Sequence, residues 1–402
     1  MSSKSKVKAA ARRLSDRIAA PYVAEIVRQG SPSGVPACPP AVAAEPSDVP
    51  TEFFHGILHE LRTVELERSR GSYERIVSVG AQGRWYFDWI ERSLGPVREH
   101  VGVEAFEPEP LDLPPYAIWR PTTADRFDGV DDDSVDLVFA GQTTEHLWAE
   151  ELAGFLLQAR RVLRSDGQLV LDSPNRLVTE HLHWSHGGHT VELSASEITE
   201  LVGLAGFAVE SVRGAWRCKF GDRVLELEEN LGDGALLVRR TMDGPTHPDD
   251  CFVWWLVARP HSEPDVAALA ERCEELYDAH WSTRVCRGMW EGPGNDGPLI
   301  VGDGESTMES LPFMLRPGRL RIAMRLNSGS TDSLTSVDLE LFLPGGHTVH
   351  RHSLADAAIH DGEVVWTLDQ TELMFALTLR LDAQASKPVR IDMPLSIQEL
   401  RA

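Results

Sequence analysis

The sequence lacks three features that would place it in a familiar class at once: a surplus of positive charge, a paired-cysteine motif and a long apolar run. Over 402 residues the formal net charge is −23. Binding a nucleic acid backbone needs a clustered positive face, so we expect no nucleic acid partner. The five cysteines are odd in number and include no CxxC pair, which argues against a disulfide framework or a zinc ribbon.

The chain also lacks an apolar stretch of the roughly 18 residues that a transmembrane helix needs. Its first residues show no uninterrupted apolar core of the signal-peptide kind, and we therefore expect a cytoplasmic protein. Residues 4–29 resemble a basic amphipathic helix interrupted at Pro21. This helix would dock on the protein's own body, or attach weakly to an anionic membrane surface. Residues 31–50, rich in Pro, Ala and Ser, predict a linker.

Apolar strand and helix patterns alternate from residue 51 to about residue 262. The expected strands are 76–79, 101–103, 135–140, 168–171, 207–212 and 252–258, and the expected helices are 52–69, 85–94, 149–163 and 194–204. Such alternation predicts an α/β domain with a mostly parallel sheet that helices cover on both faces.

The pattern changes in the last third of the chain. Residues 263–290 predict a helical connector, and from residue 291 to 402 the period becomes two. Alternating segments with Gly, Pro, Asn and Asp between them predict an antiparallel β-sandwich or jelly roll. We expect this domain to hold a glycan or to join copies of the chain into a homo-oligomer, because sandwiches of this kind often do one or the other.

Two strand ends suggest a cofactor site. The run IVSVGAQGRW places Gly80 and Gly83 between a strand and a helix, where glycine lets the backbone approach a ligand closely. Glu104 ends the next strand, 24 residues after Gly80. An acidic residue there can accept two hydrogen bonds from ribose hydroxyls, so the pair indicates a cofactor that contains a nucleoside.

The order of segments resembles the class I S-adenosylmethionine (SAM) dependent methyltransferases, and among them the small-molecule and sugar O-methyltransferases. The resemblance covers residues 51–262. It is carried by the stretches IVSVGAQGRW, VGVEAFEP, SVDLVFAGQTTEHLWAEELAGFLLQARRVLRSDGQLVLDSPNR and HTVELSASEITELVGLAGFAVE. The resemblance implies a Rossmann-like fold and SAM as the cofactor.

The resemblance also implies roles for particular residues. Gly80, Ala81 and Gly83 would pack against the methionine part of SAM, and Glu104 would hold its ribose. Phe106 or Asp125 would lie near the adenine, and Gly141 and Gln142 would line the sulfonium. Two positions depart from the family pattern, because Ser78 stands where an acidic residue is usual and Gln82 where a second glycine is common.

The resemblance and the chemistry together suggest the catalytic groups. Methyl transfer to a hydroxyl needs a base, and histidine is the natural one near neutral pH. His146 follows the fourth expected strand, and Asp172 ends the fifth on the same rim. In related sugar methyltransferases a His and an Asp at these places form the base and its partner. The alternative is that His146 caps the next helix and Asp172 is only a solvated acid.

The segment 181–189 holds four histidines within nine residues, HLHWSHGGH. Their spacing matches neither a zinc finger nor a HExxH helix, so we assign no metal ligand. A flexible loop over the substrate is the expected structure, in which Trp184 stacks on a sugar ring and His186 and His189 contact the acceptor.

The sequence as a whole therefore predicts a SAM-dependent O-methyltransferase acting on a hydroxyl of a sugar, glycan or glycosylated metabolite. One alternative is an N-methyltransferase acting on a small amine, which needs no strong base. The other is a non-catalytic glycan-binding or scaffold protein with a degenerate methyltransferase domain, which the thinned glycine turn and the added sandwich suggest.

Overall fold

The computed structural model describes residues 51–289, 299–301, 304–328 and 331–400. The helix and linker expected before residue 51 lie outside these ranges. The chain divides into two compact units. The α/β unit comprises residues 51–144, 149–178 and 193–271, and the sandwich unit comprises Glu145–Trp148, Thr179–Glu192 and the residues from Arg272 onward. The two units are interleaved in sequence, since two short segments within the first half of the chain belong to the sandwich unit. The domain boundaries expected from the sequence stay a prediction.

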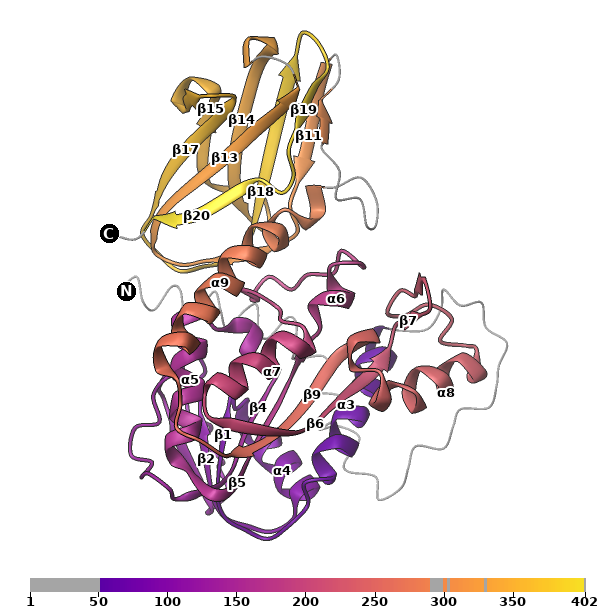
Figure 1. The fold of residues 1–402 in the computed structure, drawn as a ribbon, viewed down its shortest axis with the longest axis vertical. Helices are drawn as coiled ribbons and strands as arrows, with labels where there is room; N and C mark the ends of the chain where they lie inside the picture. Colours follow the sequence, from indigo (N-terminus) through magenta and orange to yellow (C-terminus); the bar gives the residue numbers. More distant parts are fainter. Residues whose placement is uncertain (1–50, 290–298, 302–303, 329–330, 401–402) are drawn as a thin grey trace. The chain divides into compact units, whose positions relative to one another are not determined.

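The α/β unit is built on a seven-stranded sheet (Figure 1). Its strands are β1 (Tyr73–Val79), β2 (Val97–Val103), β3 (Ala117–Arg120), β4 (Val135–Gly141), β5 (Leu163–Pro174), β6 (Phe207–Arg217) and β9 (Cys251–Pro260). They lie in the order β3-β2-β1-β4-β5-β9-β6. β9 is antiparallel to both of its neighbours, and the other pairs are parallel. The order reverses between β1 and β4, and sheets of this kind bind ligands outside the carboxyl ends of the strands at such a reversal.

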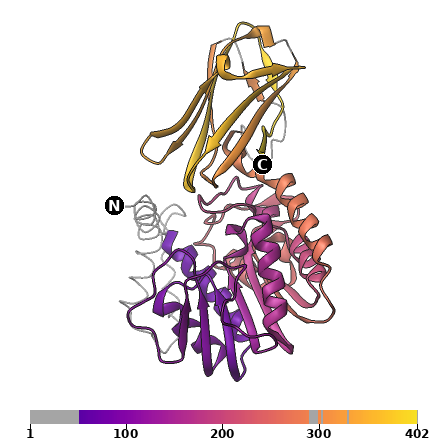
Figure 2. The ribbon, with the colours of Figure 1, turned by 90° about the vertical axis from the view of Figure 1, so that its left-hand side faces the viewer.

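Helices cover both faces of this sheet. They are α3 (Thr51–Glu67), α4 (Gly83–Leu94), α5 (Ala149–Val162) and α7 (Ala195–Leu204), while the short α6 (Arg176–Thr179) follows the end of β5. Residues of α3 and α4 pack with Leu137, Phe139 and Trp255 in one apolar core, while α5 and α7 cover the opposite face (Figure 2). With helices on both sides, β4 is buried along almost its whole length, which explains its continuous apolar run. The mostly parallel α/β fold predicted from the sequence is confirmed.

A hairpin and a helix between β6 and β9 were not predicted. They are β7 (Lys219–Phe220), β8 (Arg223–Val224) and α8 (Gly234–Met242). The guanidinium of Arg240 on α8 organises this insertion, since it donates hydrogen bonds to the backbone oxygens of Arg217, Leu227 and Glu229. It also lies 4.5 Å from the ring centroid of Trp216. A buried charge that satisfies backbone carbonyls leaves no periodic pattern, so the sequence did not reveal it.

The sandwich unit contains two antiparallel sheets that face each other (Figure 2). One contains β10 (Leu299–Val301), β13 (Gly318–Ser328), β16 (Ala358–His360), β17 (Glu363–Gln370), β19 (Val389–Ile391) and β20 (Ser396–Leu400). The other contains β11 (Gly304–Glu309), β12 (Phe313–Leu315), β14 (Leu334–Leu343), β15 (His347–Ser353) and β18 (Met374–Ala385). Alternate residues of β17 are buried, as expected for a sheet with one face in the core and one face toward solvent. The predicted sandwich is confirmed.

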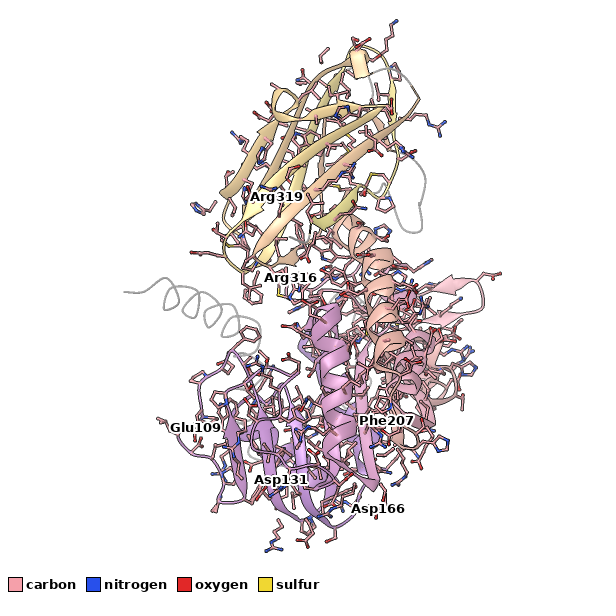
Figure 3. The ribbon with its side chains drawn as sticks, turned by 60° about the vertical axis from the view of Figure 1, so that its left-hand side comes forward. Glu109, Asp131, Asp166, Phe207, Arg316 and Arg319 are labelled. Atoms are coloured by element: carbon pink, nitrogen blue, oxygen red, sulfur yellow. The ribbon has the colours of Figure 1, made fainter. Side chains whose placement is uncertain are left out.

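Three chemical features of the chain can now be placed. The acidic surplus lies partly on the surface of the α/β unit, on the exposed loops of Glu109 and Asp131 and at the exposed Asp166 of β5 (Figure 3). Four cysteines are buried as free thiols, namely Cys218, Cys251, Cys273 and Cys286. Among the described helices, including the long α9 (Val266–Val285), none is long and apolar enough to cross a membrane.

Candidate functional site

The turn from β1 into α4 needs glycine for two reasons. Gly80 has φ of +76°, and a Cβ atom on it would lie 2.8 Å from Thr143 Oγ1. Its amide donates to the backbone oxygen of Val103 at 3.0 Å, so β1 and β2 are joined at this end. The N-cap residue of α4, Gln82, makes no capping hydrogen bond with its side chain. The first amides of α4 are therefore not capped by that side chain, as an anion-binding helix start requires.

The departure at Ser78 has a structural explanation. The Ser78 hydroxyl lies 2.7 Å from His100 Nε2, and both side chains are fully buried. Burial lowers the pKa of His100 to about 3, so the ring is neutral. A neutral hydroxyl–imidazole pair occupies this part of the core, where a carboxylate would have to be desolvated.

Glu104 follows β2 directly, at the carboxyl end of the sheet. Its Oε1 accepts hydrogen bonds from the amides of Phe106 at 2.6 Å and Glu107 at 3.0 Å. Burial raises the pKa of Glu104, while these two amides act to lower it. The loop thus holds the carboxylate in one orientation beside the glycine turn, which suits it to accept hydrogen bonds from a diol.

The two residues expected near the adenine have different surroundings. The Phe106 side chain is 61% exposed, so this apolar ring is accessible for stacking. Asp125 accepts a hydrogen bond from the Thr123 hydroxyl and is partly buried. A Cβ atom on Gly154 of α5 would lie 2.8 Å from the Asp125 Cβ, so this loop packs closely on α5.

The ends of β4 and β5 meet at Asp172. The Gln142 side chain donates to Asp172 Oδ1 at 2.6 Å, and its amide donates to the Asp172 backbone oxygen at 2.8 Å. Arg62 of α3 forms a bidentate pair with the same carboxylate, at 2.9 and 3.1 Å. A Cβ atom on Gly141 would lie 2.6 Å from Arg62 Nη2. Glycine is therefore needed where the sulfonium was expected.

Arg62 is the residue that the sequence did not single out. Its guanidinium also lies 5.4 Å from the centroid of the Trp89 ring, in cation–π contact. Only the fold shows that Arg62, unlike the arginines near it in sequence, pairs with Asp172, because the two residues are 110 positions apart. No local spacing could have identified it.

The predicted base and the predicted substrate residues belong to the sandwich unit. His146 Nδ1 lies 2.8 Å from the backbone oxygen of Gly188. The His146 and His189 ring centroids are 4.7 Å apart, and the Trp184 ring is 5.5 Å from His189. His186 is also 4.7 Å from His189. Four of the five residues predicted to act in catalysis or to bind the substrate therefore gather in one cluster, while Asp172 has its own partners in the α/β unit. The pairing of His146 with Asp172 stays a prediction.

Glu192 anchors this histidine cluster. Its carboxylate accepts from His189 Nδ1 at 2.9 Å and from Arg287 Nη1 at 2.8 Å, and Arg284 Nε lies 3.5 Å away. Burial alone would raise the pKa of Glu192, but the two arginines and His189 hold it well below its usual range. Burial lowers the pKa of His146, and lowers that of His186 to about 4. The imidazoles are therefore neutral at pH 7.

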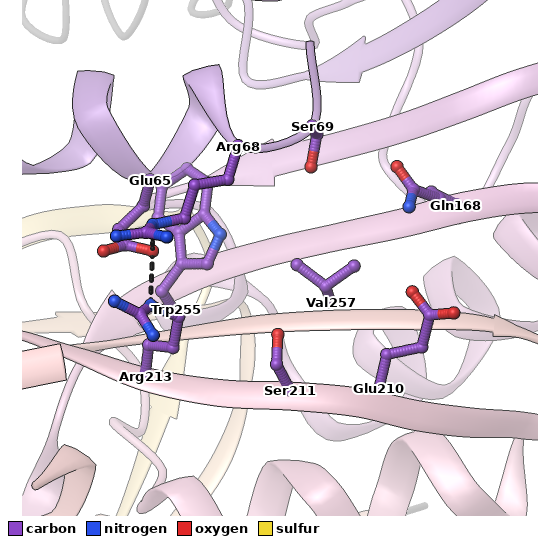
Figure 4. A pocket seen from close by; sticks show the side chains of 9 residues that line it. All are labelled: Glu65, Arg68, Ser69, Gln168, Glu210, Ser211, Arg213, Trp255 and Val257. Atoms are coloured by element: carbon purple, nitrogen blue, oxygen red, sulfur yellow. Dashed lines mark hydrogen bonds and ion pairs between the residues drawn. The ribbon is translucent and has the colours of Figure 1, made fainter. Parts of the chain in front are cut away.

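A separate hollow of about 180 Å³ lies on the α3 side of the sheet (Figure 4). Its lining includes Glu65, Gln168 and Trp255, and the Glu65 carboxylate is paired with Arg213 at 2.7 Å and Arg68 at 3.0 Å. Gln168 precedes Asp172 by four strand residues, about 13 Å. The hollow is smaller than the roughly 300 Å³ of a typical ligand pocket, and we assign it no function.

Part of the chain is similar to known methyltransferases. A family model described as "Methyltransferase domain" matches residues 108–171. A protein of Mycolicibacterium smegmatis named "Probable S-adenosylmethionine-dependent methyltransferase" is 36% identical over 124 residues, which cover 28% of this chain and 44% of that protein. A protein of Mycobacterium tuberculosis with a similar name is 33% identical over 128 residues, 29% of this chain and 43% of that protein. The chain thus spans less than half the length of these relatives.

Among the solved structures to which this chain is similar is a SAM-dependent methyltransferase from Archaeoglobus fulgidus. The match has a TM-score of 0.37 and 18% identity, and it covers 52% of this chain and 96% of that one. Within the α/β unit, residues 108–171 are therefore similar to a methyltransferase domain, and the curated relatives are named as S-adenosylmethionine-dependent enzymes.

Proposed function

We propose that this protein transfers the methyl group of SAM to a hydroxyl of a sugar, glycan or glycosylated metabolite. The observation that carries the proposal is the rim at the carboxyl ends of β1, β2 and β4. There the Gly80 turn, the oriented carboxylate of Glu104 and the close packing over Gly141 lie on one edge of one sheet.

The proposed cofactor contacts follow the family resemblance. Glu104 accepts the two ribose hydroxyls, and Gly80, Ala81 and Gly83 admit the methionine part beside the start of α4. Gly141 and Gln142 lie beside the sulfonium. The ion pair of Arg62 with Asp172 keeps the guanidinium charge balanced, which matters because an unbalanced cation would repel the sulfonium.

The proposed chemistry is an in-line displacement. The acceptor oxygen attacks the methyl carbon, the bond from carbon to sulfur breaks, and the demethylated cofactor leaves as a neutral thioether. His146 is the proposed base, since the Gly188 carbonyl oxygen can only accept a hydrogen bond and so fixes the proton on Nδ1. Nε2 then carries the lone pair that takes the hydroxyl proton.

Cofactor binding is the first test. Calorimetry with SAM and with its demethylated form should show binding to the wild-type chain. Glu104→Ala should weaken the Kd by about 100-fold, because two hydrogen bonds to a charged group are lost. Glu109→Ala, in the same loop and exposed, is the matched control and should bind as the wild type does. Absence of binding to the wild type would sink the proposal and favour the scaffold alternative.

The acceptor is the second test. Mass spectrometry of a panel of sugars and glycans incubated with SAM should show a mass gain of one methyl group on a hydroxyl. His146→Ala should lower the turnover without changing SAM affinity. Turnover on amines alone, with His146→Ala fully active, would instead identify an N-methyltransferase, since an amine needs no strong base.

A further inference from the structure

The sandwich unit brings together three side chains of the metal-ligating kind from two distant segments. Glu145, His146 and His189 each offer one ligand atom, and these atoms all lie within 4.8 Å of one another. His189 Nε2 is 4.0 Å from Glu145 Oε1. Glu145 is 1% exposed and His189 is 4% exposed, so water competes little at this place.

The second nitrogen of each ring is already engaged, in the manner typical of metal-bound histidines. His189 Nδ1 donates to the Glu192 carboxylate at 2.9 Å, and His146 Nδ1 donates to the Gly188 backbone oxygen at 2.8 Å. Both contacts place the proton on Nδ1 and leave Nε2 with its lone pair. Carboxylates and backbone carbonyls in these positions orient metal ligands and raise their basicity.

Hydrogen bonds hold the two segments in register. The Thr190 amide donates to the backbone oxygen of Glu145 at 2.6 Å. The Thr190 hydroxyl donates to the backbone oxygen of Leu147, also at 2.6 Å. Thr179 Oγ1 donates to Glu192 at 2.9 Å. A ligand set fixed in this way loses little conformational entropy when an ion binds.

The neighbouring His186 differs in a way that excludes it from the same set. Its Nδ1 accepts a hydrogen bond from the Gly188 amide at 3.2 Å. In the neutral ring the proton is then on Nε2, so this nitrogen donates and cannot bind an ion. The site thus contains two imidazoles and one carboxylate rather than three imidazoles.

We propose that Glu145, His146 and His189 bind one divalent transition-metal ion, with Zn²⁺ as the best match, and leave at least one coordination position open. Two imidazoles and one carboxylate suit Zn²⁺ or Fe²⁺, whereas Mg²⁺ and Ca²⁺ prefer oxygen ligands throughout. Ligand atoms around tetrahedral zinc lie about 3.4 Å apart, so the three side chains close by about 1 Å on binding. The spacing of the four histidines in 181–189 concealed this set, since only His189 belongs to it.

The positive charges of Arg284 and Arg287 lie near this site and would disfavour a bound cation. Both guanidiniums are directed to Glu192, at 3.5 and 2.8 Å. The two arginines exceed the charge of Glu192 by one, so an anionic ligand at the open coordination position would balance part of the charge that the ion adds.

Metal binding and the base role of His146 are alternatives, because one Nε2 atom cannot do both. In the loaded protein the ion itself would acidify a bound hydroxyl or water. The site does not rest on the proposed function, since binding is measured without SAM and without acceptor. Its failure would therefore leave methyl transfer intact.

The test uses the full chain, stripped with chelator and titrated with Co²⁺ as a visible probe that Zn²⁺ should displace. We expect one ion per chain by elemental analysis and the absorption bands of a four- or five-coordinate site. Glu145→Gln, which keeps the side-chain shape, and His189→Ala should each weaken the Kd by at least about 100-fold. His186→Ala and the exposed His360→Ala are matched controls and should bind normally.

Two results would overturn the proposal. One is a wild-type chain that binds neither Co²⁺ nor Zn²⁺ stoichiometrically. The other is a Glu145→Gln chain that binds as tightly as the wild type. Because Glu145→Gln preserves volume and shape, the test survives even where His189→Ala fails to fold.

Discussion

The cofactor rim of the α/β unit and the histidine cluster of the sandwich unit each bury a carboxylate, but with different numbers of charged partners. At the rim, the single carboxylate of Asp172 is balanced by Arg62 and Gln142. In the cluster, Glu192 is shared by two buried arginines and a histidine. The rim consists of strand ends that the sheet brings together, whereas the cluster combines loop and helix residues from distant segments that only the tertiary fold aligns. A change in the cluster should therefore cost more stability than a change at the rim.

The largest effect is expected for Glu192→Gln. This change leaves Arg284 and Arg287 buried without an ionised partner, which should lower the free energy of unfolding of the sandwich unit by about 3–5 kcal/mol. Urea denaturation followed by amide exchange of each unit measures it. Asp369→Asn removes the partner of the exposed Arg319, whose place in the sandwich unit Figure 3 labels, and should leave stability unchanged. A loss below about 1 kcal/mol for Glu192→Gln would mean that the buried arginines find other partners.

A smaller loss is expected for Arg62→Met in the α/β unit. Asp172 is fully buried but keeps Gln142, so we expect about 2–3 kcal/mol. Adding Asp172→Asn should recover most of this loss, because the uncompensated charge is then gone. Arg68→Met is the control, since Arg68 is 55% exposed and Glu65 retains Arg213. Equal losses for the two arginine variants would contradict the special place of Arg62.

Gly80→Ala should cost about 1–2 kcal/mol and also weaken SAM binding. An alanine at positive φ is strained, and its Cβ would press against Thr143 Oγ1. Gly221→Ala is the matched control, because Gly221 has φ of +65° but no atom within 4 Å of the added Cβ. In thermal unfolding, Gly221→Ala should show the cost of the strained backbone alone. In calorimetry, its SAM affinity should be unchanged. Unchanged affinity for Gly80→Ala would remove the glycine turn from the cofactor site.

The last prediction concerns pH, and its effect is smallest near neutral pH. His100 has its pKa lowered to about 3 in the folded chain, against about 6.5 when unfolded, so the unfolded state binds more protons between these values. The contribution of the neutral, buried His100 to the free energy of unfolding is complete above pH 6.5. It is lost as the pH falls toward 3, by at most about 1.4 kcal/mol per pH unit. His100→Gln should flatten the dependence of stability on pH by one proton. Burial also lowers the pKa of His59, to about 4, so His59 still contributes to the pH dependence of stability in the variant. An unchanged slope in the variant would show that folding does not lower the pKa of His100.

Much of the α/β fold was predictable because its signals are local. The apolar runs around Ile76 and Leu137 mark buried parallel strands, and Ser194 begins α7 with a capping box closed by Glu197. The period of two after residue 291 marked the sandwich for the same reason. β3 was missed, since its four residues, Ala117–Arg120, are too few to show a period.

The candidate site divides along the same line. The sequence by itself determined the glycine turn and the carboxylate of Glu104, because the positions after parallel strands follow directly from where the strands end. Only the tertiary structure decided that Arg62 covers Gly141 and that Ser78 pairs with His100. It also decided that Glu145 and His146 meet His189. Side chains far apart in sequence are brought together by packing, and packing depends on the whole chain rather than on any local period.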